Sequence, residues 1–312
     1  MIGAFFLCDC GDIHQPRFRS VGDRMRTGQL IIAEEYVIIN TVKTKVKAGE
    51  MMKYYMIDAF TDKLFSGNPA GVCVLDKPIP DEVMQNIAFE NNLSETAFLR
   101  KTENGYSLRW FTPTFEIDLC GHATLASAFA VFDKLEPDVG FVRFDTVSGI
   151  LTAEKKGGMI ELSFPIRMPE RIDITDEITD ALGFVPTELY SDRDLYAVAD
   201  SAKAVRDHVP NYGKLRKLDK WMGIAVTARG DDCDFVSRFF CPELDLEDPV
   251  TGSSHSSLVP LWSKKTGKTE FTAKQLSERG GTLYCRLCDD DIKLLGMAVL
   301  YLEGELKVEG TK

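Results

Sequence analysis

The sequence predicts an α+β protein built from two similar halves, each a sheet around one central helix. A motif that occurs twice is the first observation: Arg-Trp-Phe-Thr-Pro at 109–113 precedes Cys-Gly-His at 120–122, and Arg-Phe-Phe-Cys-Pro at 238–242 precedes Thr-Gly-Ser at 251–253. Arg109 and Arg238 are 129 residues apart, and a two-residue insertion then aligns Gly121 with Gly252. A duplicated chain usually forms two matching halves, and the cleft between them is a natural ligand site.

Short apolar runs separated by turn residues predict the elements of the first half. The turn at Ser66-Gly67-Asn68-Pro69 is expected because Gly and Asn tolerate positive φ and Pro presets the bend. Glu103-Asn104-Gly105 is a hairpin signal. Strands are predicted over 54–60, 70–75, 96–100, 107–111, 142–146, 151–155 and 159–164, with helices over 80–91 and 122–132. The second of these helices is apolar almost all round, which predicts that it is buried.

The second half repeats this pattern after a proline-containing joint at 165–169. We expect a helix over 174–182 ending at Gly183, and strands over 225–228, 235–240 and 292–302. A helix over 253–263 resembles the first buried helix, and Pro260 should kink it or end it early. The predicted halves are residues 52–165 and 166–312, with the last strand a candidate to return to the first half. Residues 1–51 read as an atypical N-terminal extension, and a structured strand over 31–41 is the competing interpretation.

The composition limits the classes of molecule that this protein is expected to bind. The 312 residues carry a net charge of −11 with no Lys/Arg cluster, so we expect neither nucleic acid nor a membrane surface as partner. No apolar run reaches the ~20 residues that span a bilayer. Eight scattered cysteines and the lack of a secretory leader favour reduced thiols in the cytoplasm. A small molecule is therefore the expected partner.

The two glycine turns are candidate anion sites. Gly121 and Gly252 each lead into a predicted helix whose first N–H groups lack internal partners, and such groups favour a substrate carboxylate. The competing interpretation is that these glycines only permit tight turns.

Glu95 is the candidate general acid/base. It lies at the start of a strand with apolar neighbours, and burial there would favour the protonated carboxyl group, which suits proton transfer near neutral pH. A glutamate that caps a loop end is the alternative. At the 129-residue offset Glu95 aligns with Ile224, so a symmetric structural role is disfavoured.

His122, Asp248 and Ser253 are candidate substrate-binding residues. His122 follows Gly121 at a predicted helix start, where the helix dipole would lower its pKa and keep the ring neutral. Asp248 and Ser253 flank the second turn and could bind substrate, or they could simply cap the helix. No metal site is predicted, because Cys285 and Cys288 lack a second ligand pair.

The motifs together resemble the phenazine-biosynthesis (PhzF-like) isomerase family over residues 54–302. The matching segments are 58–61, 67–70, 92–98, 109–113, 118–124, 247–253, Gln275 and 277–281. The resemblance implies the diaminopimelate epimerase-like fold, two pseudo-symmetric halves each with a curved, mostly antiparallel sheet around a central helix, and a homodimer. It places the family's acid/base glutamate on Glu95, its histidine on His122, and its aspartate and serine on Asp248 and Ser253, with no cofactor.

These expectations define a cofactor-independent isomerase that moves a proton on a small carboxylate. Glu95 would transfer the proton, and His122, Asp248, Ser253 and the turns at Gly121 and Gly252 would hold the substrate. One alternative is a racemase or epimerase that uses Cys120, although related two-thiol enzymes have a cysteine at each glycine turn and this chain has Thr251 at the second. The other alternative is a binding or regulatory protein without chemistry.

Overall fold

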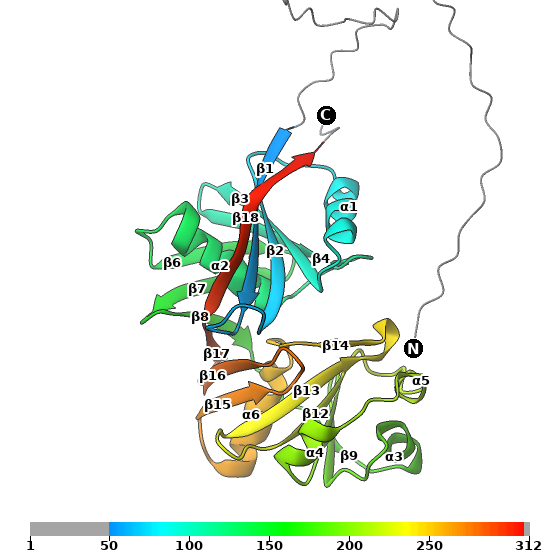
Figure 1. Ribbon diagram of the computed structural model, residues 1–312. Coiled ribbons are helices and arrows are strands. Elements are labelled where there is room, and N and C mark those ends of the chain that lie inside the picture. Colours follow the sequence, from blue (N-terminus) through cyan, green and yellow to red (C-terminus); the bar gives the residue numbers. More distant parts are fainter. Residues whose placement is uncertain (1–49, 309–312) are drawn as a thin grey trace, which may run out of the picture. The chain divides into compact units, whose positions relative to one another are not determined.

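The computed structural model describes residues 50–308 (Figure 1). The extension predicted over 1–51 lies outside them except at its end, where Glu50 and Met51 already belong to β1. The strand considered over 31–41 lies outside them altogether.

The first half consists of a sheet that surrounds the buried helix α2 (Figure 1). Its strands meet the predicted positions within a few residues, and every residue of α2 except Phe129 is buried. The elements are β1 (Glu50–Ala59), β2 (Asn68–Leu75), α1 (Asp81–Asn91), β3 (Glu95–Thr102), β4 (Gly105–Phe111), β5 (Glu116–Ile117), α2 (Gly121–Ala130), a π-helical turn (Val131–Leu135), β6 (Phe141–Thr146), β7 (Gly149–Lys156) and β8 (Met159–Pro165).

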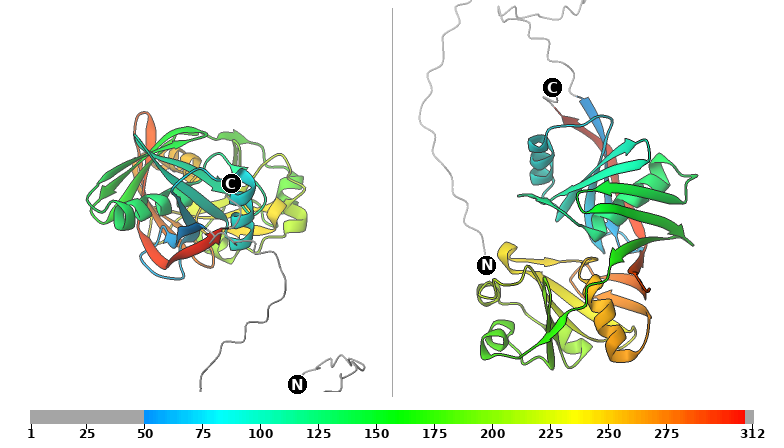
Figure 2. Two further views of the ribbon diagram at one scale, coloured as in Figure 1. Left: turned by 90° about the horizontal axis from the view of Figure 1, so that it is seen from above. Right: turned by 180° about the vertical axis from the view of Figure 1, so that it is seen from behind.

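In the second half α6 is the helix that corresponds to α2, and the strands are hydrogen-bonded into one continuous sheet with those of the first half (Figures 1 and 2). The elements of the second half are β9 (Glu170–Ile172), α3 (Asp176–Leu182), β10 (Glu188–Ser191), β11 (Leu195–Val198), α4 (Ala202–Asp207), α5 (Tyr212–Leu215), β12 (Ile224–Arg229), β13 (Phe235–Cys241), a 3₁₀ turn (Pro242–Leu244), β14 (Leu246–Asp248), α6 (His255–Thr266), β15 (Glu270–Gln275), β16 (Gly281–Leu287), β17 (Asp291–Gly296) and β18 (Ala298–Val308).

Most strand pairs are antiparallel, and the parallel ones are β2–β3, β4–β6, β11–β12 and β13–β15. The two halves join where β8 pairs with β17. After β17 the chain crosses back, and β18 pairs antiparallel with β1 of the first half. The predicted α+β architecture is confirmed.

One element prediction is wrong in detail, and of the two outcomes predicted for Pro260 the structure excludes one, an early end of the helix. The single strand predicted over 292–302 is two strands, because the chain changes partner at Met297, from β8 to β1. Pro260 does not end α6, which continues to Thr266. Proline lacks the N–H that would bind the carbonyl of Ser256 one turn earlier. That carbonyl instead accepts a hydrogen bond of 3.0 Å from the backbone N–H of Arg167.

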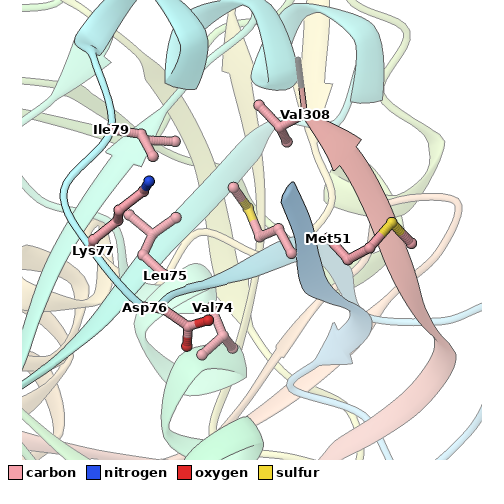
Figure 3. A pocket seen from close by; sticks show the side chains of 8 residues that line it. Met51, Val74, Leu75, Asp76, Lys77, Ile79 and Val308 are labelled. Atoms are coloured by element: carbon pink, nitrogen blue, oxygen red, sulfur yellow. The ribbon is translucent and has the colours of Figure 1, made fainter. Parts of the chain in front are cut away.

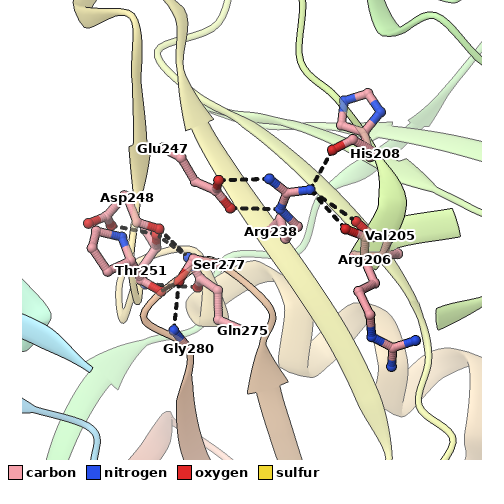
Figure 4. A network of polar contacts seen from close by, with 11 residues as sticks. Val205, Arg206, His208, Arg238, Glu247, Asp248, Thr251, Gln275, Ser277 and Gly280 are labelled. Atoms are coloured by element: carbon pink, nitrogen blue, oxygen red, sulfur yellow. Dashed lines mark hydrogen bonds and ion pairs between the residues drawn. The ribbon is translucent and has the colours of Figure 1, made fainter. Parts of the chain in front are cut away.

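The repeated motif builds the same bidentate ion pair in each half. Nε and Nη2 of Arg109 donate to the two carboxylate oxygens of Glu116 at 2.6 and 2.7 Å. In the second half Nε and Nη2 of Arg238 donate to the two carboxylate oxygens of Glu247, both at 2.7 Å (Figure 4). Each pair ties the short strand β5 or β14 to its longer neighbour, β4 or β13. The duplication seen in the sequence is therefore present in the side-chain contacts.

Candidate functional site

The site begins where two parallel strands start side by side. In the β2–β3 pair Ala70 lies opposite Glu95, so Asn68 and Glu95 stand at the same end of neighbouring strands. The turn before β2 needs glycine, since Gly67 has φ of +67° and an added Cβ would lie 2.2 Å from the Ala59 carbonyl oxygen. Helix α2 packs against both strands and begins with Gly121 and His122.

The two glycine turns meet face to face. A Cβ added to Gly121 would lie 3.1 Å from Cα of Gly252, and one added to Gly252 would lie 3.2 Å from Cα of Gly121. A side chain at either position would force the turns apart. The close approach explains both glycines, and it brings the N-terminal ends of α2 and α6 together as the repeat predicted.

His122 lies between groups from three elements. Its Nε2 is 3.0 Å from Oε2 of Glu95, an ion-pair distance without the alignment of a hydrogen bond, and its Nδ1 is 3.1 Å from Nδ2 of Asn68. The Cys120 sulfur lies 3.6 Å from the same Nδ1. The imidazole is only 4% exposed, whereas the Glu95 side chain is 16% exposed.

Asp248 reaches the site from the second half, at the end of β14. Its Oδ1 accepts a hydrogen bond of 2.7 Å from Asn68, and its Oδ2 accepts one from the Thr251 hydroxyl. The side chain of Gln275 holds this turn, because its amide group bonds both the Asp248 carbonyl and the backbone N–H of Thr251, at 2.7 and 2.9 Å (Figure 4). Ser253 is half-buried within the same turn.

The electrostatics of His122 differ from the sequence expectation. Burial of the ring lowers its pKa, but the neighbouring Cys120 and Glu95 side chains outweigh burial, and the pKa lies well above its ordinary value. Burial and the nearby Glu95 carboxylate raise the pKa of the Cys120 thiol to about 11. Cys120 is therefore uncharged at neutral pH, and Glu95 is the charge that favours a proton on His122. The expected lowering by the helix dipole is wrong, because a carboxylate in contact outweighs the partial charges of a helix end.

Burial also raises the pKa of Asp248, and the Glu95 carboxylate adds to the increase. The pKa values of His122, Cys120 and Asp248 are thus all shifted, and shifted pKa values are typical of sites where catalytic proton transfer occurs.

Glu95, Cys120 and His122 offer ligand atoms within 4.8 Å of one another, a spacing that a metal ion could use. The imidazole, however, presents Nδ1 to Cys120 and Nε2 to Glu95. One ion cannot bind a ring through both nitrogens, so these three residues would have to rearrange to share a metal. The arrangement fits proton transfer better than metal binding.

Sequence reasoning gave no site role to three residues at the site. Asn68 was assigned to a turn and a matching segment, and Gln275 and Arg279 to matching segments. Arg279 of the second half donates to the Gly67 carbonyl at 2.8 Å and to the buried carboxylate of Asp58, also at 2.8 Å. The available signals were their polar character and their place in the matching segments.

A separate cavity of about 290 Å³ lies at the far end of β2 from Asn68, beside Leu75 (Figure 3). Its walls include Met51, Lys77 and Val308, and none of the predicted site residues. No helix within residues 50–308 is long and apolar enough to cross a membrane.

The chain is similar to known proteins over most of its length. The family model described as "Phenazine biosynthesis-like protein" matches residues 57–304. A protein of Halalkalibacterium halodurans named an uncharacterized isomerase is 46% identical over 259 residues, which cover 81% of this chain and 97% of that protein. The crystal structure of a phenazine biosynthesis PhzC/PhzF protein from Clostridium difficile is 52% identical, with a TM-score of 0.79, and covers 82% of this chain and 100% of the other. A predicted epimerase of Pseudomonas aeruginosa, 20% identical with a TM-score of 0.63 over 82% of this chain and 99% of its own, shares the fold.

Proposed function

The chain belongs to the phenazine biosynthesis-like family and is an isomerase, and from this premise we propose that Glu95 moves a proton between two carbons of a small carboxylate without a cofactor. The observation that carries the proposal is the contact of 3.0 Å between the Glu95 carboxylate and Nε2 of His122, beside the paired glycine turns.

The proposed reaction uses one carboxylate twice. Glu95 takes a proton from an activated carbon of the substrate, and the electron pair of the broken C–H bond delocalises into the adjacent unsaturated group. The protonated Glu95 then returns the proton to a second carbon, so no proton or electron is gained or lost overall. General acid/base catalysis of this kind contributes roughly 10²–10⁴-fold in rate.

The remaining residues supply binding and orientation. The N-terminal ends of α2 and α6 present backbone N–H groups to a substrate carboxylate, and Ser253 can donate its hydroxyl. Asp248 accepts a hydrogen bond from an amine or hydroxyl group of the substrate. Cyclic amino acids and hydroxy acids carry such a group together with a carboxylate. A carbanion-like intermediate would be stabilised by the proton that Glu95 favours on His122.

Solvent deuterium incorporation tests the proposal. A panel of cyclic amino and hydroxy acids is incubated with the enzyme in D₂O, before and after treatment with a chelator. We expect incorporation into at least one substrate, unchanged by the chelator and lost in Glu95→Gln. Incorporation that persisted in Glu95→Gln would exclude Glu95 as the acid/base, and tight binding without incorporation would indicate a binding protein instead.

A further inference from the structure

Arg193 is a partly buried cation whose hydrogen-bond donors are largely unpaired. It lies in the turn between β10 and β11, and its side chain is 31% exposed. Its Nε is buried and has no hydrogen-bond partner within residues 50–308. Its Nη2 makes only a long contact, 3.5 Å from Oδ2 of Asp194. By contrast, Nε and Nη2 of Arg238 both bind Glu247 at 2.7 Å.

The sheet places the charged end of Arg193 on the face that carries Asp248. Residues opposite each other on paired strands project to the same face, and so does every second residue along a strand. One row of opposite residues crosses four neighbouring strands and consists of Tyr196, Ala225, Phe239 and Asp248. Asp194, which contacts the guanidinium group, lies two residues before Tyr196 and therefore on this face.

The turn that contains Arg193 also lies beside the N-terminal end of α6. The hydroxyl of Ser257, in the first turn of α6, donates to the carboxylate of Asp192 in that turn. Ser257 follows Gly252 by five residues, roughly 7 Å along a helix. Gly252 is the glycine that meets Gly121 at the candidate site. Arg193 is therefore next to the place where the proposed substrate carboxylate binds.

The thiol of Cys241, at the end of β13, lies in the electric field of both groups of charges. Burial raises its pKa, and the carboxylates of Asp248 and Glu95 raise the pKa further. The guanidinium group of Arg193 acts on the same thiol in the opposite direction and lowers its pKa. This shared influence supports the location of Arg193 beside the site.

A guanidinium group with free donors at this place suits an acidic ligand. Arginine binds a carboxylate through two parallel hydrogen bonds, and Arg109 and Arg238 both use Nε and Nη2 for this purpose. The carboxylates of Glu95 and Asp248 would repel a second acidic group of a substrate, so such a group needs a cation of its own. Arg193 supplies that cation through the same pair of nitrogens.

We propose that Arg193 is a specificity-determining residue that binds a second acidic group of the substrate, so that the enzyme prefers small dicarboxylates to monocarboxylates of the same length. One carboxylate would bind at the glycine turns and the other at Arg193, with the carbons between them in front of Glu95. The position of the first carboxylate rests on the proposed function, whereas the preference for a second acidic group is measured without turnover.

The test compares the binding of matched acids to the full chain near neutral pH, followed by NMR titration. The dicarboxylates are succinate, glutarate and adipate, and the monocarboxylates are butyrate, pentanoate and hexanoate. We expect at least one dicarboxylate to bind about 10-fold more tightly than the monocarboxylate of the same length, the usual effect of a hydrogen bond to a charged group. Arg193→Gln should remove this preference. Arg171→Gln, which removes an exposed arginine from β9, is the matched control and should keep it.

Equal binding of both kinds of acid to the wild type, or the same loss in Arg171→Gln, would overturn the proposal. The competing explanation is that Arg193 only neutralises the buried Asp194. The double variant Arg193→Gln/Asp194→Asn tests it, and this variant also replaces Arg193→Gln if the single variant fails to fold. We expect the double variant to lack the preference and Asp194→Asn alone to keep it, so a preference restored in the double variant would refute the assignment.

Glu95→Gln separates this proposal from the proposed reaction. Because binding requires no proton transfer, Glu95→Gln should keep the preference for dicarboxylates while losing deuterium incorporation. A wild-type preference that depends on Arg193 therefore stands even if Glu95 proves not to be the acid/base, and its absence leaves the test of Glu95 intact.

Discussion

At the residue scale, the site depends on where the two copies of the repeat disagree. Glu95 has Ile224 as its counterpart, and Asp248 has Ile117, so each half contributes one acid that the other lacks. Cys120 faces no second thiol, since Thr251 at the matching turn bonds Asp248. The residue types and their places were predictable from sequence. The pKa of His122 was not, because it depends on a contact with Glu95 that only folding creates.

His255, which follows the second glycine turn, leads to a prediction about pH and stability. Burial lowers its folded-state pKa to about 4, and its Nδ1 contacts the Thr251 carbonyl at 2.9 Å. The unfolded chain, with an ordinary histidine pKa near 6.5, binds the extra proton between these values. The free energy of unfolding should therefore fall as pH drops from about 7 to 4, by up to about 3 kcal/mol from this group. Chemical denaturation across this range should show a shallower pH dependence for His255→Gln, and an equal dependence would contradict the assignment.

At the element scale, the sequence predicted the turns and helices that their own residues determine. The 103–105 hairpin and the buried helix α2 follow from turn residues and apolar periodicity. An early end of α6 at Pro260 and a single strand over 292–302 are not found, because a distant partner decides each case: the N–H of Arg167 binds the carbonyl that Pro260 leaves free, and β1 pairs with the chain after Met297. The short strand β14 could not be predicted either, because the ion pair between Arg238 and Glu247 holds it in place.

The duplicated ion pair allows a matched test at this scale. Glu247→Gln should loosen β14 and misplace Asp248, whereas Glu116→Gln loosens β5, which carries no proposed site residue. We expect Glu247→Gln to reduce kcat/KM for deuterium incorporation by about 10-fold or more, and Glu116→Gln to leave it within about 2-fold. Thermal unfolding of both variants controls for stability. Equal loss of activity in the two would show that the pair does not position Asp248.

At the scale of residues 50–308 as a whole, polar contacts beside the candidate site hold the two halves together. Arg279 bonds the carboxylate of Asp58, which is 3% exposed, and the carbonyls of Ser66 and Gly67 just before Asn68. The backbone N–H of Gly67 also donates to the Gly280 carbonyl at 2.8 Å. The repeat predicted two halves and a cleft between them, but not these contacts, since they join segments more than 200 residues apart.

Arg279→Ala should therefore reduce the free energy of unfolding by roughly 3 kcal/mol, because it leaves the Asp58 carboxylate buried without its cation. Adding Asp58→Asn should recover part of this loss by removing the unpaired charge. Arg206→Ala, which breaks an exposed pair of 3.9 Å with Asp231, should cost less than about 1 kcal/mol. Urea denaturation measures all three, and a double variant no more stable than Arg279→Ala would refute the pairing as the cause.

The central claim is that one glutamate, and no cysteine, transfers the proton. The most direct measurement compares solvent deuterium incorporation by Glu95→Gln and Cys120→Ser, on one substrate, under the same conditions. We expect Glu95→Gln to lose at least 10²-fold, the usual contribution of a general acid/base, and Cys120→Ser to lose less than about 10-fold. Loss of activity in Cys120→Ser with full incorporation by Glu95→Gln would contradict the account and identify a thiol-dependent racemase or epimerase.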